Sequence, residues 1–261
     1  MEFHFYKYQG TGNDFIIADN RNNSIELSTE QVNKLCNRHF GIGADGLMLL
    51  NDKPGFDFEM KYYNSDGNEG SMCGNGGRCM VKFAYDLGIH RELYRFMATD
   101  GLHEAEIDID GIVALKMQDV NKVTRFHNDY ILNTGSPHYI KVVTDVSGID
   151  VFKKGQEIRY SKDFEKEGIN VNFVELEAEP DKISIRTYER GVENETLSCG
   201  TGVTAAALVC YHNENGYNEV EIKTKGGVLT VEYDRTDEDT FKNIWLCGPA
   251  EKVFEGKVLI N

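Results

Sequence analysis

The sequence is short of positive charge. Its 28 lysine and arginine residues stand against 43 aspartate and glutamate residues, so the formal net charge is −15 over 261 residues. This deficit argues against nucleic acid or an anionic membrane surface as a partner, although a local site can still bind an anionic small molecule. No apolar run approaches the ~20 residues of a membrane-spanning helix, and "MEFHFYKYQG" lacks a signal-peptide pattern. We therefore expect a cytoplasmic protein.

The six cysteines include no C-x-x-C pair. They stand at positions 36, 73, 79, 199, 210 and 247. In a chain of this length without an export signal, this usage indicates reduced thiols. Neither His39 nor His90 has metal-ligand spacing near Cys73 and Cys79, so we expect no metal site.

No Pro- or Ser-rich linker interrupts the chain, but the chain repeats itself. "GTGNDFI" at 10–16 resembles "GSPHYI" at 135–140, and "TDGLHEAEI" resembles "TKGGVLTVEY". The corresponding landmarks keep one order and nearly one offset: Gly10 and Gly135, Asn13 and His138, Asn64 and Glu189, Cys73 and Cys199, Thr99 and Thr224. An ordered series of this kind indicates a duplication, hence two related domains of roughly 120 residues each.

The local patterns predict an α+β fold. Alternating segments such as "FHFYKY" and "KISIRTYE" predict strands of a mixed or antiparallel sheet. A capping pattern from Ser28 to Gln31 opens a peripheral helix that extends through "STEQVNKLCNRHF", residues 28–40. The strongest helix signals follow Cys73 and Cys199: an apolar pattern from Cys79 that Gly88 ends, and the almost wholly apolar run 203–210.

The predicted architecture is two pseudo-twofold-related domains, each a sheet wrapped around a central helix. We place the N-terminal domain at 1–118, completed by about 250–261, and the C-terminal domain at 119–249. The segment "GIGADG", 41–46, formally fits a dinucleotide-binding loop, but a helix rather than a strand precedes it, so we interpret it as turn geometry. "CGNGGR" likewise lacks the ending of a P-loop.

Cys73 and Cys199 each stand beside glycines where a helix begins. A buried structural cysteine is the ordinary interpretation. At a helix N-terminus, however, free N–H groups and the helix dipole favour a thiolate and can hold a carboxylate. One such cysteine suggests a nucleophile. Two in symmetric halves suggest that one thiolate removes a proton from a carbon while the opposite thiol protonates the other face.

Over nearly its whole length the sequence resembles the diaminopimelate epimerases. The resemblance is carried by "GTGNDFI", "NRHFGIGADG", "YNSDGNEGSMCGNGGRC", "GSPHYI", "YERG" and "CGTG". It implies an isomerase without cofactor, independent of pyridoxal phosphate, that interconverts LL- and meso-diaminopimelate in lysine and peptidoglycan precursor biosynthesis. The implied partners are the small-molecule substrate and a second copy in a homodimer.

The resemblance also assigns site residues. Cys73 and Cys199 would be the catalytic acid/base pair, with His138 and Glu189 as the polar residues that support the thiols. The residues carried over as substrate-binding are Asn13, Asn64, Gly74, Asn75, Asn170, Glu189, Arg190, Gly200 and Thr201. Two positions depart from the family pattern: Gly46, where some members have Gln, and Ser136, where many have Asn. A serine hydroxyl there would contact the distal end of the substrate directly or through water.

Three alternatives stay open at this point. A related racemase of proline, hydroxyproline or histidine would share the fold, but proline racemases have a "CGHG"-like first motif where this chain has "CGNG". A thiol–disulfide redox protein would be expected to carry C-x-x-C. A binding domain without chemistry would leave the two helix-entrance cysteines unexplained.

Overall fold

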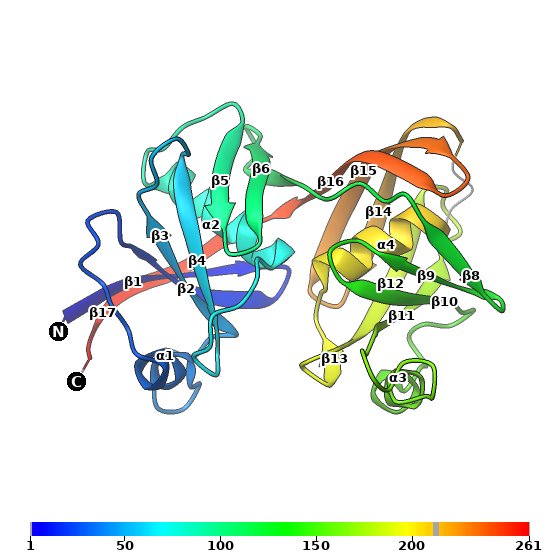
Figure 1. Ribbon diagram of the computed structural model, residues 1–261, viewed down its shortest axis with the longest axis horizontal. Helices are drawn as coiled ribbons and strands as arrows, with labels where there is room; N and C mark the ends of the chain where they lie inside the picture. Colours follow the sequence, from blue (N-terminus) through cyan, green and yellow to red (C-terminus); the bar gives the residue numbers. More distant parts are fainter. Residues whose placement is uncertain (1, 211–213, 261) are drawn as a thin grey trace. The chain divides into compact units, whose positions relative to one another are not determined.

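A computed structural model describes residues 2–210 and 214–260 of the chain (Figure 1). The chain forms two compact units. Unit 1 comprises Met1–Leu115 with Pro249–Asn261, and unit 2 comprises Lys116–Gly248. Within the described residues, no helix is both long enough and apolar enough to cross a membrane.

Unit 1 is one mixed sheet with two helices. Its elements are β1 (Glu2–Gly10), β2 (Asn13–Asp19), α1 (Thr29–Cys36), β3 (Gly46–Asn51), β4 (Phe58–Asn64), α2 (Gly74–Asp86), β5 (Tyr94–Ala98), β6 (Gly101–Ile107), β7 (Ile112–Lys116) and β17 (Glu251–Leu259). β1 lies antiparallel between β17 and β2. β2 is parallel to β3, β3 antiparallel to β4, and β4 parallel to β5, after which β5, β6 and β7 continue antiparallel.

Unit 2 repeats this plan. Its elements are β8 (Val123–Phe126), β9 (Asp129–Asn133), β10 (Pro137–Val142), α3 (Val151–Arg159), β11 (Asn170–Leu176), β12 (Lys182–Glu189), β13 (Asn194–Thr196), α4 (Gly200–Cys210), β14 (Gly216–Thr224), β15 (Gly227–Asp237) and β16 (Thr240–Pro249). β9 is antiparallel to β8 and β10, β10 parallel to β11, β11 antiparallel to β12, and β12 parallel to β14. β14, β15 and β16 continue antiparallel.

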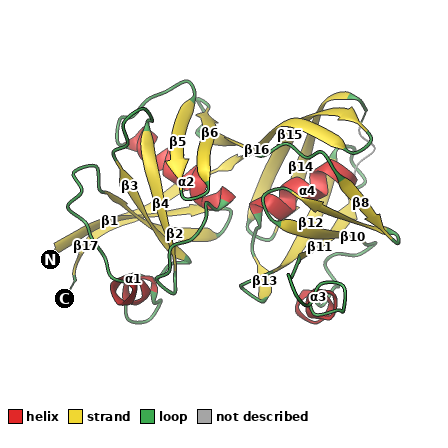
Figure 2. Ribbon diagram, in the orientation of Figure 1, coloured by secondary structure: helices red, strands yellow, loops and turns green. Residues whose placement is uncertain are grey.

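The two units therefore share one topology, and the predicted α+β fold is confirmed. In each unit an outer helix joins two parallel strands, α1 between β2 and β3 and α3 between β10 and β11. A second helix, α2 or α4, is enclosed by strands of its own unit (Figure 2). The strand that flanks the first hairpin of unit 1 comes from the other end of the chain, because β17 follows β16 but pairs with β1; in unit 2 the equivalent strand, β8, directly precedes its partner β9.

The helix boundaries follow local signals with one exception. The capping box of Ser28 and Gln31 is present at α1. Gly88 adopts a φ of 85°, which suits the left-handed position that ends α2. The prediction that the first helix reaches residue 40 was wrong: α1 ends at Cys36 because the Asn37 side chain accepts hydrogen bonds from the backbone N–H groups of His39 and Phe40.

The segment "GIGADG" is the loop that follows α1, as the turn interpretation predicts. The N–H groups of Ile42 and Gly43 both donate to the carbonyl of Leu35, at 2.9 and 3.0 Å. Gly43 has a φ of 82°, and a Cβ at Gly41 would lie 2.0 Å from the Lys34 carbonyl oxygen. These glycines serve the close return of the chain over α1.

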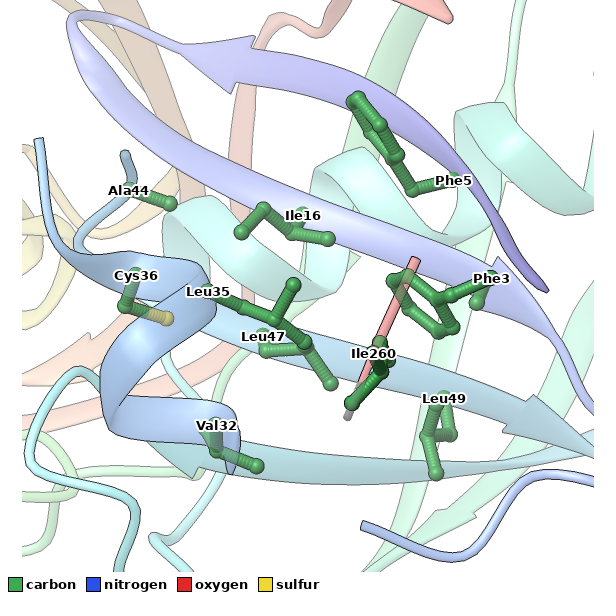
Figure 3. Close-up of a cluster of buried hydrophobic side chains, with 11 residues drawn as sticks. Phe3, Phe5, Ile16, Val32, Leu35, Cys36, Ala44, Leu47, Leu49 and Ile260 are labelled. Carbon is green, nitrogen blue, oxygen red and sulfur yellow. The ribbon is translucent and has the colours of Figure 1, made fainter. Parts of the chain in front are cut away.

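In unit 1, a cluster of buried hydrophobic side chains lies between α1 and the sheet (Figure 3). Val32 and Leu35 of α1 pack with Leu47 and Leu49 of β3, and all four are buried. Helix α1 has polar residues on its other side, so this amphipathic face is what attaches it to the sheet.

Truncation of this cluster should destabilise unit 1. Leu47 is 0% exposed, so Leu47→Ala removes buried methyl groups and leaves a cavity, at a cost of about 2–5 kcal/mol in the free energy of unfolding. Amide hydrogen exchange in β2–β4 measures the effect. Leu102→Ala on β6 is the control, because Leu102 is 45% exposed and its truncation should change protection little. Equal protection in both variants would contradict the prediction.

Candidate active site

In unit 1, Cys73 stands at the N-terminus of the buried helix α2. It is the N-cap residue, with extended φ and ψ of −100° and 134°, and its carbonyl accepts from the Gly77 N–H at 2.7 Å. The first turn, from Gly74 to Gly77, is buried. A Cβ at Gly77 would meet the Met72 sulfur at 3.0 Å, so the glycines let this turn pack closely. The first-turn N–H groups make the helix start suited to an anion.

Arg78 supports this helix start from inside the unit. Its side chain is fully buried, and it donates to Asn75 Oδ1 at 3.0 Å, to Thr11 Oγ1 at 3.3 Å and to the Gly74 carbonyl at 3.4 Å. It therefore links the two residues after Cys73 to the turn between β1 and β2. The sequence prediction omitted Arg78, although its place one turn after Gly74 was a usable signal.

Asn13, at the start of β2, is held by a charged cluster. Its Nδ2 donates to Asp45 Oδ2 at 3.2 Å, while Arg38 bridges Asp45 and Asp14 at 2.7 Å to each. Burial opposes ionisation of Asp14, but hydrogen bonds from Arg38 and Lys7 outweigh it and lower the pKa of this carboxyl to about 2. Burial, and next the charge of Asp14, raise the pKa of Asp45. Within the described residues, the buried Asn13 Oδ1 has no hydrogen-bond partner.

Asn64 and Gly46 face each other on neighbouring strands, in register at the ends of β4 and β3. Asn64 is exposed and opens a turn in which its carbonyl accepts from the Gly67 N–H at 2.9 Å. A Cβ at Gly46 would lie 2.4 Å from the ring of Tyr62 and 2.8 Å from its hydroxyl oxygen. Tyr62 thus fills the space that a side chain at position 46 would require, which explains the glycine there.

In unit 2, Cys199 repeats the arrangement at α4. Its carbonyl accepts from the Val203 N–H at 2.8 Å, as that of Cys73 does from Gly77. Its sulfur lies 3.5 Å from Thr201 Oγ1, and Thr201 Oγ1 lies 2.8 Å from His138 Nε2. Burial, followed by the charge of Arg190, lowers the pKa of His138 to about 3. The His138 imidazole, which contacts Thr201 at the start of α4, is therefore neutral at physiological pH.

Asn170 and Arg190 lie together near the start of β10. The Asn170 side chain accepts from the Arg190 backbone N–H at 2.8 Å and donates to Ser136 Oγ at 2.9 Å. The Arg190 guanidinium donates to the same Ser136 Oγ at 3.3 Å and to the Glu167 carbonyl at 3.0 Å. Ser136, which the sequence marked as a departure from the family pattern, therefore belongs to this group.

In each unit, most of the residues predicted from the sequence lie at the ends of strands or at the start of the buried helix. In unit 2, His138 and Asn170 are register partners at the starts of parallel β10 and β11. Glu189 ends β12, where it is half-buried and paired with Asn194. Gly200 and Thr201 begin α4. Within residues 2–210 and 214–260, no three His, Cys, Asp or Glu side chains gather closely enough to hold a metal ion.

These features define the class of protein: a duplicated α+β fold built on two buried helices, each of which begins at a cysteine. Among solved structures, a PhzF-family phenazine biosynthesis protein of Bacillus anthracis matches with a TM-score of 0.75 at 15% identity over 100% of both chains. A probable proline racemase of Agrobacterium radiobacter K84 matches with a TM-score of 0.70 at 13% identity, over 99% of this chain and 93% of that one. These likenesses show the fold alone.

The sequence comparisons go further. The family model "Diaminopimelate epimerase" matches residues 5–123 and 130–253. A diaminopimelate epimerase of Flavobacterium psychrophilum is 50% identical over 252 residues, which cover 96% of this chain and 98% of that protein. The chain belongs to the diaminopimelate epimerase family and is an isomerase.

Proposed function

We propose that this protein interconverts LL- and meso-2,6-diaminopimelate by a two-base mechanism that uses Cys73 and Cys199 and no cofactor. The observation that carries the proposal is the repeated arrangement, in a member of this family, of a cysteine at the N-terminus of each buried helix. A single nucleophile would need only one such arrangement.

The proposed reaction is a proton exchange at the α-carbon. One cysteine, as thiolate, accepts the α-proton; the other, as thiol, donates its proton to the opposite face of the same carbon. The charge that develops on the reacting carboxylate is held by N–H groups of the first helical turns, at Gly74–Asn75 and Gly200–Thr201. After one turnover the thiol and the thiolate have exchanged places, so the return reaction restores the starting state.

The polar side chains would hold the rest of the substrate. Because the amide nitrogen of Asn13 is engaged by Asp45, its Oδ1 is the atom that would contact a ligand. An amide oxygen accepts hydrogen bonds, so it suits an ammonium group of the substrate. The guanidinium of Arg190, with Asn170 beside it, suits the distal carboxylate. Asn64, His138 and Glu189 complete the proposed site.

The setting we propose is the one that the family implies. The protein would act in the cytoplasm, as a homodimer, in lysine and peptidoglycan precursor biosynthesis. Its two functional domains would be 1–118 completed by about 250–261, and 119–249.

Substrate-dependent exchange with heavy water tests the proposal directly. The protein without added pyridoxal phosphate should convert LL-diaminopimelate to the meso form and place one solvent deuterium at the inverted carbon. Lysine and proline should exchange poorly. Comparable turnover of proline or histidine would replace the substrate assignment with one of the related racemases. Absence of exchange with any amino acid would contradict the mechanism.

The hydrogen bond from Asn13 to Asp45 leads to a separate prediction. Asp45→Ala removes the acceptor that orients the Asn13 amide, so KM for diaminopimelate should rise about 10-fold, the equivalent of one hydrogen bond to a charged group. The kcat value should change less. Steady-state kinetics measures both constants. Asp45→Asn keeps an oxygen for Asn13 and should lose less, and the exposed Asp52→Ala is the control. An unchanged KM in Asp45→Ala would contradict this role.

A further inference from the structure

Asn172 of β11 is fully buried, and its side chain makes three polar contacts. Its Nδ2 donates to the Tyr139 carbonyl at 3.1 Å, and its Oδ1 accepts from the Thr187 hydroxyl at 2.9 Å. A carbonyl can only accept a hydrogen bond, so the amide cannot turn over without placing its oxygen against the Tyr139 oxygen. The orientation of the Asn172 side chain is therefore fixed by the sheet.

This orientation determines where His138 carries its proton. Asn172 Nδ2 also lies 3.1 Å from His138 Nδ1. Because Nδ2 is a donor, Nδ1 must accept, and the hydrogen of the neutral ring sits on Nε2. Asn172 also disfavours an imidazolium, in which an Nδ1–H would face an N–H of the amide.

From His138, the donor-to-acceptor direction of these hydrogen bonds continues toward the sulfur of Cys199. His138 Nε2–H donates to Thr201 Oγ1 at 2.8 Å, so the hydroxyl proton of Thr201 is left to point elsewhere. The Cys199 sulfur lies 3.5 Å from this oxygen, within reach of the Thr201 hydroxyl proton. A Cβ at Gly202 would lie 2.4 Å from Asn172 Oδ1 and 3.2 Å from the His138 ring, so the first turn of α4 lies directly on the pair.

We propose that Asn172 is a positioning residue that fixes the Nε2–H form of His138 and thereby directs the Thr201 hydroxyl proton onto the sulfur of Cys199. The inference rests on the proposed function, in which Cys199 is one of two acid–base groups. A hydrogen bond donated to sulfur stabilises the thiolate and prepares Cys199 to accept the α-proton. No sequence motif marked Asn172.

Few charged groups bear on this chain of contacts. Besides His138, the titratable side chains of β10 are Tyr139 and Lys141, which both contact Asp129. After β12, the charge of Arg190 acts on the His138 ring. On β15, Tyr233 donates to the Ala207 carbonyl, further along α4. Asn172 and Thr187 are uncharged. The direction of donation is therefore set by neutral hydrogen bonds.

The tautomer is measured by ¹⁵N NMR of the imidazole nitrogens, with His138 assigned among the seven histidines by its loss in His138→Gln. We expect His138 in the wild-type protein to be neutral, with hydrogen on Nε2, between pH 6 and 9. In Asn172→Asp the carboxylate can only accept, so the hydrogen should move to Nδ1 or be joined by a second one there. An Nδ1–H form or an imidazolium in the wild-type protein overturns the inference, and this measurement needs no variant to fold.

The effect on sulfur is measured by alkylation of Cys199 with iodoacetamide across pH, followed by peptide mass spectrometry in a Cys73→Ser background. Asn172→Leu removes the fixed donor at similar size. The pH of half-maximal alkylation should rise by about one unit, which corresponds to loss of one hydrogen bond to an ionised group. An unchanged midpoint overturns the inference.

Two controls separate positioning from general loosening. Thr187→Val removes the hydroxyl but keeps both donations of Asn172, so the tautomer and the Cys199 midpoint should stay. Asn172→Leu should leave the midpoint of Cys73 unchanged when it is measured in a Cys199→Ser background, and a shift there too overturns the specific role. Neither readout depends on catalytic turnover. A failure of this inference is therefore distinguishable from a failure of the proposed function, which the heavy-water assay tests.

Discussion

Replacing either Cys73 or Cys199 with alanine should abolish epimerisation. In the proposed mechanism every inversion uses both sulfurs, one to accept and one to donate a proton, so neither variant retains a complete pair. Loss of positioned acid–base catalysis costs about 10²–10⁴-fold, and loss of the only group on one face should reach the upper end of that range. Conversion of LL- to meso-diaminopimelate by each purified variant measures the effect.

Cys36→Ala is the matched control. Cys36 is buried in the cluster of Figure 3, where burial raises the pKa of its thiol to about 12 and keeps it protonated. This variant should turn over normally if it folds, which circular dichroism checks. Full activity in either helix-entrance variant would leave a one-base or cofactor-assisted reaction as the explanation.

Arg190→Ala should raise KM for diaminopimelate by about 10²-fold or more, because two hydrogen bonds to a charged group contribute roughly 3 kcal/mol. The Arg190 guanidinium already meets Ser136 Oγ and the Glu167 carbonyl, so it is held in place before a ligand arrives. Wild-type protein should discriminate against lysine, which lacks the distal carboxylate, by at least about 10²-fold. In Arg190→Ala this discrimination should narrow.

Two variants sharpen this test. Arg190→Lys keeps the charge but not the paired donors of the guanidinium, so its KM for diaminopimelate should lie between those of the wild-type protein and Arg190→Ala. Arg125→Ala removes an exposed arginine of the same unit, paired with Glu238 on the surface, and should leave KM unchanged. If Arg190→Ala discriminates against lysine as strongly as wild type does, the distal carboxylate is held elsewhere.

The sequence was most informative where the signal is local. Glycines after Cys73, the apolar run of α4 and the capping box at Ser28 each concern neighbours in the chain, and each predicted its element. The fixed offset between the halves predicted their common topology. The end of α1 was missed because a short side chain, Asn37, offers the backbone a competing turn.

The supporting residues could not be predicted in the same way. Arg78 and Asn172 act through partners 67 and 34 positions away, and those contacts exist only once strand register is set. From the sequence alone, a buried asparagine on a strand cannot be distinguished from a solvent-exposed polar residue. Ser136 was visible only as a departure, since its meeting with Asn170 and Arg190 depends on the turn before β10.

The pairing of β1 with β17 has a consequence for how the molecule is made. Unit 2 is one continuous stretch, whereas β1 of unit 1 waits for β17, whose residues Glu251–Leu259 are synthesised after the whole of unit 2. Until then β1 is an open sheet edge, and Phe5 lacks the Phe254 ring that it meets at 5.9 Å. On the ribosome the second half of the chain should therefore reach its native structure before the first half, the reverse of the usual N-to-C order.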